Sequence, residues 1–361
     1  MKSLLFTLEY PPFRGGIANY YGNLAKFWPI KEKLNVLDNN RGELSTGNGF
    51  MSWWPAIFAL KRKLARDKYD FLLVGQILPL GTAAFIVSLF RPTKYIVFLH
   101  GMDLAFALRS EWKRGLSHLI LRRAHKIICA NSFVQEKLME FDSRLADKTG
   151  LINPGIEGDA PNIDEAELRN LKNSYNLDGQ TILLSLGRLV KRKGVDRTIE
   201  ALVHIPENIK QNLRYFIAGA GPREEYLKQL VPAHCAERIT FLGELSEEEK
   251  WAWLKLCDIF IMPSRDISGD FEGFGIVYLE ANLCSKPVIA GNSGGVRDAV
   301  INEETGLLVD PDKVDAIGAA IVRLADDPVL RERLGAQGRA RAIRDFSWEK
   351  QAAQTWQLIK E

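Results

Sequence analysis

The segment 272–280 of this 361-residue chain carries the residue types best suited to binding a ligand. It reads Glu-Gly-Phe-Gly-Ile-Val-Tyr-Leu-Glu, so two carboxylates bracket a glycine-rich turn and the start of an apolar helix. Gly273 and Gly275 allow the backbone to bend sharply and to expose its amides. The helix start adds unsatisfied N–H groups and the positive end of the helix dipole. This combination suits a ligand with both phosphate and hydroxyl groups, such as a sugar nucleotide, although two solvated glutamates around a capped helix would give the same pattern.

The residues before this segment favour the ligand-binding interpretation. An apolar run at 257–262 predicts a buried strand that ends in Pro263-Ser264, and parallel sheets bind ligands at the carboxyl ends of their strands. A Glu-x7-Glu pattern after such a strand resembles the donor site of the family 4 retaining glycosyltransferases of the GT-B fold. The resemblance implies that Glu272 contacts hydroxyls of the transferred sugar and that Glu280 holds the ribose hydroxyls. It also implies that four turn residues line the donor site: Gly273, Phe274, Gly275 and Ile276.

A basic loop at 187–194 reads Gly-Arg-Leu-Val-Lys-Arg-Lys-Gly and follows another predicted strand. The guanidinium of Arg188 offers a planar set of donors, and the ammonium of Lys193 offers a mobile charge. Both suit a diphosphate leaving group, whose negative charge grows as the bond to the sugar breaks. The Gly-Arg-x4-Lys-Gly pattern resembles the family's phosphate-binding Arg and Lys, which assigns that role to Arg188 and Lys193. We interpret Lys191 and Arg192 as solvated.

Two further loops follow predicted strands in the first half of the chain. At 9–17, Gly15 and Gly16 precede a helix, so backbone amides can approach and hold a phosphate. A tight turn would use the same two glycines, but the resemblance identifies them with the glycine-rich loop that faces the donor diphosphate. His100 ends another strand, where a structural histidine bonded to backbone is the alternative. The resemblance implies that His100 touches the transferred sugar and that Asp103 faces the acceptor.

The resemblance assigns two more positions to the nucleotide and none to a metal. Gly219 belongs to a strand-to-helix turn at 218–222 near the nucleotide, and Leu242 begins a loop at 242–246 that contacts the base through backbone groups. Because backbone contacts leave the base undetermined, we expect a UDP-, GDP- or ADP-sugar. The five histidines show no metal-ligand spacing, and the resemblance implies that no metal or other cofactor is required.

Charge is unevenly distributed along the chain. Residues 1–156 contain 22 Lys and Arg against 12 Asp and Glu, a net charge of +10, whereas the remainder contains 26 against 33, a net charge of −7. An anionic membrane surface or a phosphate-bearing acceptor fits the basic half, and no motif supports nucleic acid. At 50–66, Trp53 and Trp54 precede the basic run Lys61, Arg62 and Lys63, a composition typical of helices at a membrane interface. The alternative is a helix that packs on the sheet and has a solvated basic rim.

Short apolar runs alternate with helical patterns throughout the chain, which predicts parallel sheets covered by helices on both faces. We therefore expect an α/β GT-B fold, with two Rossmann-like, doubly wound domains facing each other across a cleft. Pro154 and Gly155 indicate the boundary between an acceptor-side domain at 1–155 and a donor domain at 156–346. By resemblance, a helix at 347–361 packs back onto the first domain. The expected strands are 3–8, 35–38, 71–75, 95–100, 126–130, 150–153, 181–186, 213–218, 239–241, 259–262, 287–290 and 306–309.

These features predict a retaining glycosyltransferase that moves a sugar from a nucleoside-diphosphate sugar to a hydroxyl acceptor, with lipid-linked or cell-envelope glycans as candidate acceptors. The alternatives are a sugar-nucleotide epimerase of the same fold and an inactive protein that binds sugar nucleotides. The chain shows no signal peptide and no apolar stretch long enough to span a bilayer. We therefore expect a cytoplasmic protein that works at the inner face of the membrane.

Overall fold

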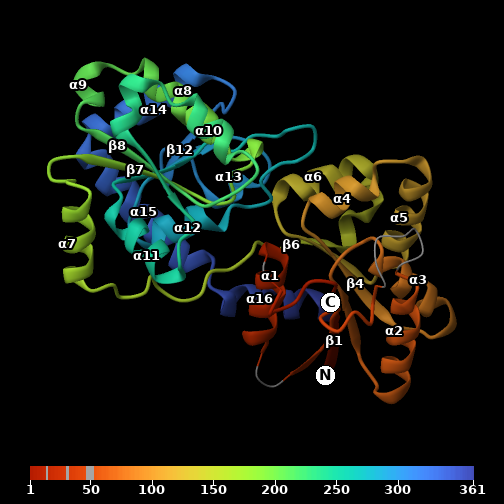
Figure 1. The fold of residues 1–361 in the computed structure, drawn as a ribbon. Helices are drawn as coiled ribbons and strands as arrows, with labels where there is room; N and C mark the ends of the chain where they lie inside the picture. The colour runs from red at the N-terminus through yellow and green to blue at the C-terminus, as the bar shows by residue number, and fades with distance from the viewer. Residues whose placement is uncertain (14, 30–31, 46–52) are drawn as a thin grey trace. The chain divides into compact units, whose positions relative to one another are not determined.

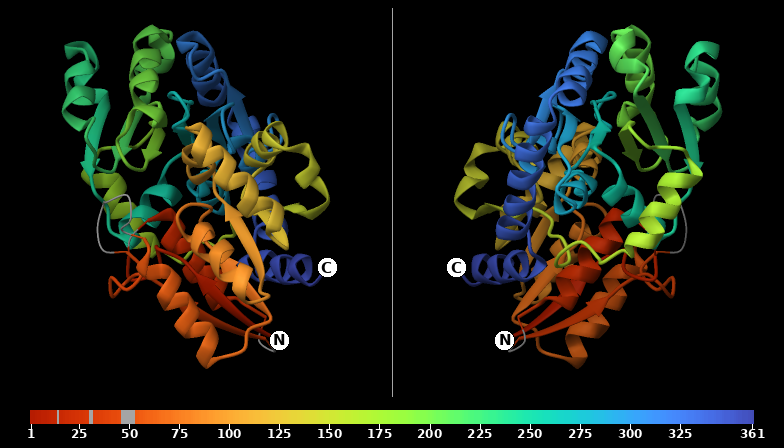
Figure 2. Two further views of the ribbon diagram at one scale, coloured as in Figure 1. Left: turned by 90° about the vertical axis from the view of Figure 1, so that its right-hand side faces the viewer. Right: turned by 90° about the vertical axis from the view of Figure 1, so that its left-hand side faces the viewer.

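A computed structural model describes the chain except for residues 14, 30–31 and 46–52. The backbone divides into two compact units. The first unit comprises Met1–Gly155 together with Ser347–Glu361, and the second unit comprises Ile156–Phe346. Each unit contains one parallel six-stranded sheet with helices packed against it (Figures 1 and 2).

The sheet of the first unit has the strand order β2-β1-β3-β4-β5-β6. Strands β1, β3, β4 and β5 are almost entirely buried, as expected of parallel strands covered on both faces. The strands are β1 (Lys2–Phe6), β2 (Lys33–Leu37), β3 (Phe71–Val74), β4 (Lys94–Leu99), β5 (Lys126–Cys129) and β6 (Thr149–Leu151). The helices are α1 (Gly16–Lys26), α2 (Pro55–Arg66), α3 (Leu80–Phe90), α4 (Met102–Ala107), α5 (Glu111–Arg123), α6 (Ser132–Phe141), η1 (Ser143–Lys148) and α16 (Trp348–Lys360).

The sheet of the second unit has the order β12-β11-β10-β7-β8-β9. The strands are β7 (Thr181–Leu186), β8 (Leu213–Ala218), β9 (Ile239–Gly243), β10 (Ile259–Met262), β11 (Val288–Gly291) and β12 (Gly306–Val309). The helices are α7 (Glu165–Ser174), η2 (Lys191–Lys193), α8 (Val195–His204), α9 (Glu207–Lys210), α10 (Glu224–Leu230), η3 (Ala233–Arg238), α11 (Glu247–Leu256), α12 (Ile276–Leu283), α13 (Val296–Ala299), α14 (Val314–Asp326) and α15 (Pro328–Asp345).

All twelve expected strands are present, and their pairing is parallel. Several strand ends differ from the expected ones by one or two residues, and one of these differences affects a predicted site residue. Strand β9 continues to Gly243, so Leu242 lies inside the strand and does not begin a loop. The extension follows from a register shift between Ile217 and Ala218, after which Ala218 pairs with Gly243. The Gly219 amide then donates to the Gly243 carbonyl at 2.7 Å and ends the ladder one residue later.

Each sheet has one position where the strand order reverses, between β1 and β3 in the first unit and between β7 and β10 in the second. Loops that leave neighbouring strands at such a position diverge to opposite faces and open a ligand site at the carboxyl ends. In the second unit, β7 leads into the loop of Arg188 and Lys193, and β10 leads into the turn of Glu272. Topology therefore brings the predicted diphosphate and sugar contacts of this unit to one sheet edge.

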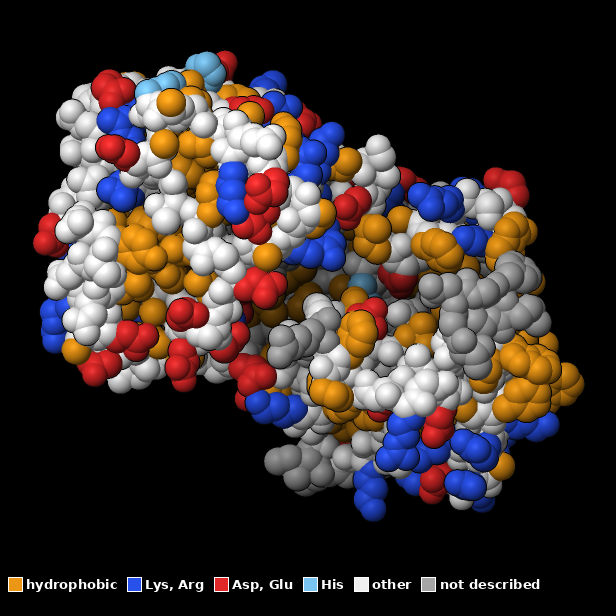
Figure 3. Space-filling model, viewed as in Figure 1, with side chains coloured by type: hydrophobic (Ala, Val, Ile, Leu, Met, Phe, Trp, Pro, Cys, Tyr) orange, Lys and Arg blue, Asp and Glu red, His pale blue; other side chains and the backbone are white. Residues whose placement is uncertain are grey.

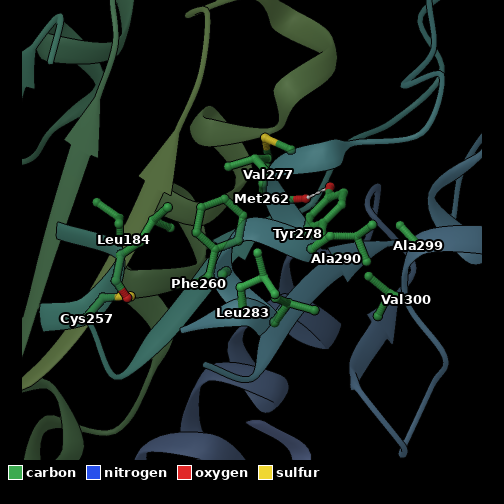
Figure 4. Close-up of a cluster of buried hydrophobic side chains, with 14 of the residues drawn as sticks. Leu184, Cys257, Phe260, Met262, Val277, Tyr278, Leu283, Ala290, Ala299 and Val300 are labelled. Atoms are coloured by element: carbon green, nitrogen blue, oxygen red, sulfur yellow. Dashed lines mark hydrogen bonds between the residues drawn. The ribbon is translucent and has the colours of Figure 1, made fainter. Parts of the chain in front are cut away.

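The core of the second unit anchors the start of α12 (Figure 4). Leu184 from β7, Phe260 from β10 and Tyr278 from α12 belong to the same buried cluster. The Tyr278 hydroxyl donates to the Met262 carbonyl at 2.6 Å and lies 3.2 Å from the Ser264 hydroxyl. Met262 ends β10 and Ser264 follows it, so Tyr278 ties the end of this strand to the helix that follows the Glu272 turn.

Aromatic contacts attach α16 to the core of the first unit. Trp348 contacts Tyr20 of α1, with ring centroids 5.2 Å apart, and Trp356 contacts Trp28 at 5.6 Å. Both tryptophans are buried in the same cluster as residues of β1, β3 and β4. The last helix of the chain is therefore part of the first unit's core and covers α1.

Candidate active site

The loop after β7 presents two cations in the second unit. Arg188 is exposed, and within the described part of the chain it forms no ion pair. Lys193 is more enclosed, with 12% of its side chain exposed. Together with Gly187, Ala218 and other residues, they line a small surface pocket at the carboxyl end of β7. An unpaired guanidinium beside a partly enclosed ammonium is a binding site for an anion with several oxygens.

Glycine turns allow neighbouring loops to pack closely beside this pocket. Gly219 has a φ of 120°, and a Cβ at this position would lie 2.1 Å from the Gly187 carbonyl oxygen. Any side chain would therefore push apart the loops that follow β7 and β8. The same glycine also donates its amide to Gly243 at the end of β9. Gly219 thus holds together the ends of three neighbouring strands.

Glu272 lies against Lys193 in this structure. Its Oε2 atom is 2.7 Å from the Lys193 ammonium, and the residue as a whole is 9% exposed. The turn that follows depends on Gly275, whose φ is 79° and which caps α12. A Cβ there would lie 2.4 Å from the Tyr278 ring. Phe274 is buried, whereas Ile276, the first residue of α12, is exposed.

The interpretation of Arg192 as a solvated residue is wrong. Its side chain is 19% exposed, and its Nη1 atom lies 3.4 Å from Asp270 Oδ1. Its Nε atom lies 3.9 Å from Glu272 Oε2. The 3-10 turn η2 directs this side chain toward the Glu272 turn, where two carboxylates compensate its charge. Lys191, in contrast, is exposed as expected.

Glu280 has a different partner from Glu272. Its Oε1 atom lies 2.9 Å from the ammonium of Lys250 on α11, and both side chains are mostly buried. Burial lowers the pKa of Lys250, but the carboxylates of Glu280 and Glu247 outweigh this effect and raise it overall. The ion pair orients the Glu280 carboxylate on α12, eight residues after Glu272.

The predicted phosphate loop of the first unit is open to solvent. Gly15 and Gly16 are exposed, and Gly15 caps the start of α1. A Cβ at Gly16 would meet nothing within 4 Å, whereas one at Gly15 would lie 3.5 Å from Glu9 Oε2. Because both glycines are exposed, a ligand can approach this loop from solvent.

His100 follows β4 and is held by a side chain that the sequence did not indicate. Its Nε2 atom lies 2.8 Å from the hydroxyl of Tyr21 on α1. The rings of Tyr20 and Tyr21 contact the imidazole edge-on, at 4.8 and 5.4 Å between centroids. Burial lowers the pKa of His100 to about 4, so the imidazole is neutral at physiological pH.

Asp103 organises the loop that carries His100. Its Oδ1 atom accepts from the amides of both His100 and Gly101, each at 2.9 Å. Its Oδ2 atom is buried without a hydrogen-bond partner among the described residues. Burial raises the pKa of Asp103, against the opposing effect of these amide bonds. Oδ1 thus orders the backbone of the His100 loop, whereas Oδ2 has no hydrogen-bond partner among the described residues.

The tryptophan-containing segment of the first unit has one face that is buried and another that is exposed, aromatic and basic. Its residues 50–52 lie outside the described part. On α2, Leu60 and Leu64 are buried, while Trp53 is partly buried. Trp54 and Phe58 are exposed and touch each other, with ring centroids 5.2 Å apart. The basic run is mostly outward: Lys61 and Arg62 are exposed and Lys63 is half-buried.

Metal-binding clusters are not found among the residues that the structure describes, since no three His, Cys, Asp or Glu side chains are grouped to hold an ion. Likewise, no helix in the described ranges is long and apolar enough to cross a membrane. The independence from metals inferred from the sequence stays a prediction.

Three residues at these sites had no recognisable motif: Tyr21, Arg192 and Lys250. Each of them contacts a partner that is distant in the sequence. Tyr21 contacts His100, 79 residues away; Arg192 contacts Asp270, 78 residues away; and Lys250 contacts Glu280, 30 residues away. A tyrosine in an amphipathic helix and a lysine in an acidic one look like ordinary core and surface residues. Only the tertiary contacts distinguish them.

Comparison with known proteins identifies a family and several relatives that this chain resembles. Residues 169–341 match the family described as Glycosyl transferases group 1. A curated relative from Mycobacterium tuberculosis (strain CDC 1551), named GDP-mannose-dependent alpha-(1-6)-phosphatidylinositol monomannoside mannosyltransferase, is 29% identical over 99% of this chain and 98% of its own. A Corynebacterium glutamicum protein, named GDP-mannose-dependent monoacylated alpha-(1-6)-phosphatidylinositol monomannoside mannosyltransferase, is 27% identical over 96% of this chain and 95% of its own.

Solved structures show the same fold. The crystal structure of Anabaena Alr3699/HepE in complex with UDP is similar over the whole of both chains, with a TM-score of 0.82 and 19% sequence identity. The two parallel six-stranded sheets of this protein are those of the GT-B fold. Residues 169–341 belong to the Glycosyl transferases group 1 family, and the protein is a glycosyltransferase of the GT-B fold.

Proposed function

We propose that this glycosyltransferase moves a mannosyl residue from GDP-mannose to a hydroxyl group of a lipid-borne acceptor, with retention of the anomeric configuration. The donor and the class of acceptor are suggested by the names of curated relatives that align with nearly the whole chain. The observation that carries the proposal is the unpaired Arg188 beside Lys193 at the strand-order reversal of the second unit.

The diphosphate would be bound by these two cations. As the bond between sugar and phosphate breaks, negative charge accumulates on the leaving group, and preorganised donors lower the energy of that state. The guanidinium of Arg188 can donate to two oxygens at once, while Lys193 supplies a movable charge. The amides of Gly15 and Gly16 would add further donors in the same role.

Lys193 would change partners when the donor binds. Without ligand its ammonium lies on Glu272, and a diphosphate would compete for it. Arg192 would remain near Glu272 and limit the cost of leaving a nearly buried carboxylate without Lys193. Glu272 would then be available to accept hydrogen bonds from the sugar hydroxyls.

The remaining donor contacts would fix the sugar and the ribose. Glu280, oriented by Lys250, would accept from the ribose hydroxyls, and His100 would contact the transferred sugar. The turn residues Gly273 to Ile276 and the end of β9 at Leu242 would line the nucleotide. Asp103, whose Oδ1 orders the loop of His100, would lie on the acceptor side.

A lipid-borne acceptor requires the enzyme to work at a membrane surface. The exposed aromatic and basic side chains of α2 (Trp54, Phe58, Lys61 and Arg62, here called the α2 face) have the composition of an interfacial helix. Figure 3 shows hydrophobic side chains beside Lys and Arg side chains on the first unit. The net charge of +10 over residues 1–156 would attract anionic lipids.

The test is a transfer assay with purified protein. GDP-mannose, UDP-glucose and ADP-glucose are each incubated with a phosphatidylinositol mannoside in mixed micelles, and products are identified by mass spectrometry. We expect GDP release and a glycolipid heavier by one hexose with GDP-mannose only. NMR of the new linkage should show the α configuration of the donor.

Two results would overturn parts of this proposal. Transfer from a UDP- or ADP-sugar but not from GDP-mannose would show that the proposed donor is wrong. Transfer to a water-soluble mannoside in preference to the glycolipid would show that the proposed acceptor class is wrong. The Lys191→Ala variant serves as the matched control for Lys193→Ala, since both changes remove one lysine from the same loop. A contaminating activity would survive both substitutions equally.

A further inference from the structure

The hydroxyl of Tyr21 connects two groups in the first unit. It lies 2.8 Å from the Gly75 carbonyl oxygen at the end of β3 and 2.8 Å from His100 Nε2 at the end of β4. Tyr21 is completely buried, on the face of α1 that packs on the sheet. The phenol therefore bridges the carboxyl ends of two neighbouring strands.

Counting protons assigns a direction to both hydrogen bonds. A carbonyl oxygen can only accept, so the single hydroxyl proton of Tyr21 must be donated to Gly75. The lone pairs of the hydroxyl remain, and they can only accept from His100. His100 must then carry its proton on Nε2, and in a neutral ring this leaves Nδ1 as an acceptor.

The surroundings hold the imidazole in this state. Two tyrosine rings contact it edge-on, and Asp103 fixes the backbone on which it sits. Within the described ranges, Nδ1 has no hydrogen-bond partner, and His100 as a whole is only partly buried. The ring is thus prepared to offer a lone pair to an incoming donor.

We infer that Tyr21 fixes the Nε2–H tautomer of His100, so that Nδ1 accepts a hydrogen bond from a hydroxyl of the transferred sugar. Tyr21 is then a positioning residue that acts through His100. The part concerning the sugar rests on the proposed function, whereas the tautomer is a property of the free protein. The alternative tautomer would place a proton on Nδ1, so the ring could only donate to the hydroxyl oxygen and could not accept the hydroxyl proton.

The experiment compares Tyr21→Phe with Tyr20→Phe. Both variants keep an aromatic ring against the imidazole, but only the first removes the hydroxyl that accepts from Nε2. Two-dimensional NMR of 15N-histidine-labelled protein distinguishes the tautomers, with His100→Gln identifying the resonance. We expect the Nε2–H pattern in wild type and Tyr20→Phe, and a mixture of tautomers in Tyr21→Phe.

Kinetics then connect the tautomer to turnover. Loss of one hydrogen bond should lower kcat of Tyr21→Phe by roughly threefold to tenfold, with a smaller change in the KM for the donor. Tyr20→Phe should stay within about twofold of wild type, below the effect of one such bond.

An Nδ1–H pattern in the wild-type protein would overturn the inference, as would a Tyr21→Phe variant with an unchanged spectrum and unchanged kcat. Failure of the proposed function gives a different result, because the spectra would keep the expected tautomers while no sugar donor is consumed. If Tyr21→Phe does not fold, the wild-type spectrum alone still decides which nitrogen carries the proton.

Discussion

At the scale of single residues, type and spacing identified the side chains that follow strand ends. Arg188, Lys193 and Glu272 could be found because a loop after a parallel strand must lie at the ligand-binding edge of its sheet. Arg192 was misinterpreted because its partner Asp270 lies 78 residues further along the chain. A sequence pattern does not reveal a contact between residues so far apart. An arginine between two lysines, as here between Lys191 and Lys193, is typical of a solvated loop.

Removal of either member of the Lys193–Glu272 pair should reduce turnover strongly. For Lys193→Ala and Glu272→Ala we expect kcat to fall on the order of a hundredfold, because each removes a charge that acts on the reacting groups. Circular dichroism should show an unchanged fold, and Lys191→Ala should behave as wild type. If both variants keep the wild-type kcat/KM, the assignment of these residues to the donor site is wrong.

Arg192 should matter for donor binding more than for the chemical step. With Arg192→Gln, a diphosphate that takes Lys193 leaves the nearly buried Glu272 carboxylate without a nearby cation. The KM for the donor should therefore rise roughly tenfold or more, because an uncompensated buried charge is costly. Arg192→Lys should recover part of this loss. Arg169→Gln, an exposed change on α7, is the control. An unchanged KM in Arg192→Gln would show that Lys193 does not change partners.

At the scale of elements, strands were the most predictable feature. The ends of β7, β8, β10 and β12 coincide with the expected ones, because strands that are mostly buried have mostly apolar sequences. Helix α4 was missed: its six residues follow His100-Gly101 directly and are too few to show a periodic pattern. The end of β9 was misplaced since a register shift lengthens the strand without leaving a mark in the sequence.

The α2 face should make membrane binding sensitive to salt. We expect wild-type protein to sediment with vesicles that contain anionic phosphatidylglycerol and to be released as ionic strength rises. A triple change of Lys61, Arg62 and Lys63 to Ser should weaken binding by roughly 3 kcal/mol, about 1 kcal/mol per basic residue.

The matched control for this membrane test removes three exposed basic residues from the second unit: Arg169, Lys228 and Lys313. It changes the net charge of the protein by the same amount but leaves the α2 face intact. Equal loss of vesicle binding in both triple variants would mean that total charge, and not this helix, governs association. Absence of any binding by wild type would remove the membrane contact altogether.

At the scale of the whole molecule, alternation of strands and helices was enough to predict two doubly wound parallel sheets. The strand order within each sheet follows from the handedness and length of the connections. Contacts such as those of Trp348 with Tyr20 could not be derived in this way, because aromatic residues in a terminal amphipathic helix do not specify which surface they cover. Resemblance to a family supplied the expected position of that helix.

Catalysis should not depend on a divalent cation. Arg188, Lys193 and backbone amides are expected to compensate the diphosphate charge, so extensive treatment with EDTA should leave kcat within about twofold of the untreated enzyme, well below the loss expected when a charge-stabilising group is removed. Added Mg²⁺ or Mn²⁺ should not restore or increase activity. Loss of turnover on chelation that is reversed by one of these ions would contradict the prediction.

The attachment of α16 to the first unit has a consequence for biosynthesis. The residues that complete the core around Tyr20 and Trp28 are translated only after the whole second unit, so the first unit cannot finish folding before the second unit has been synthesised. The second unit is contiguous and can fold first, although domains usually mature in N-to-C order. A nascent chain stalled before residue 347 should therefore carry a protease-resistant C-terminal half and a protease-sensitive N-terminal half.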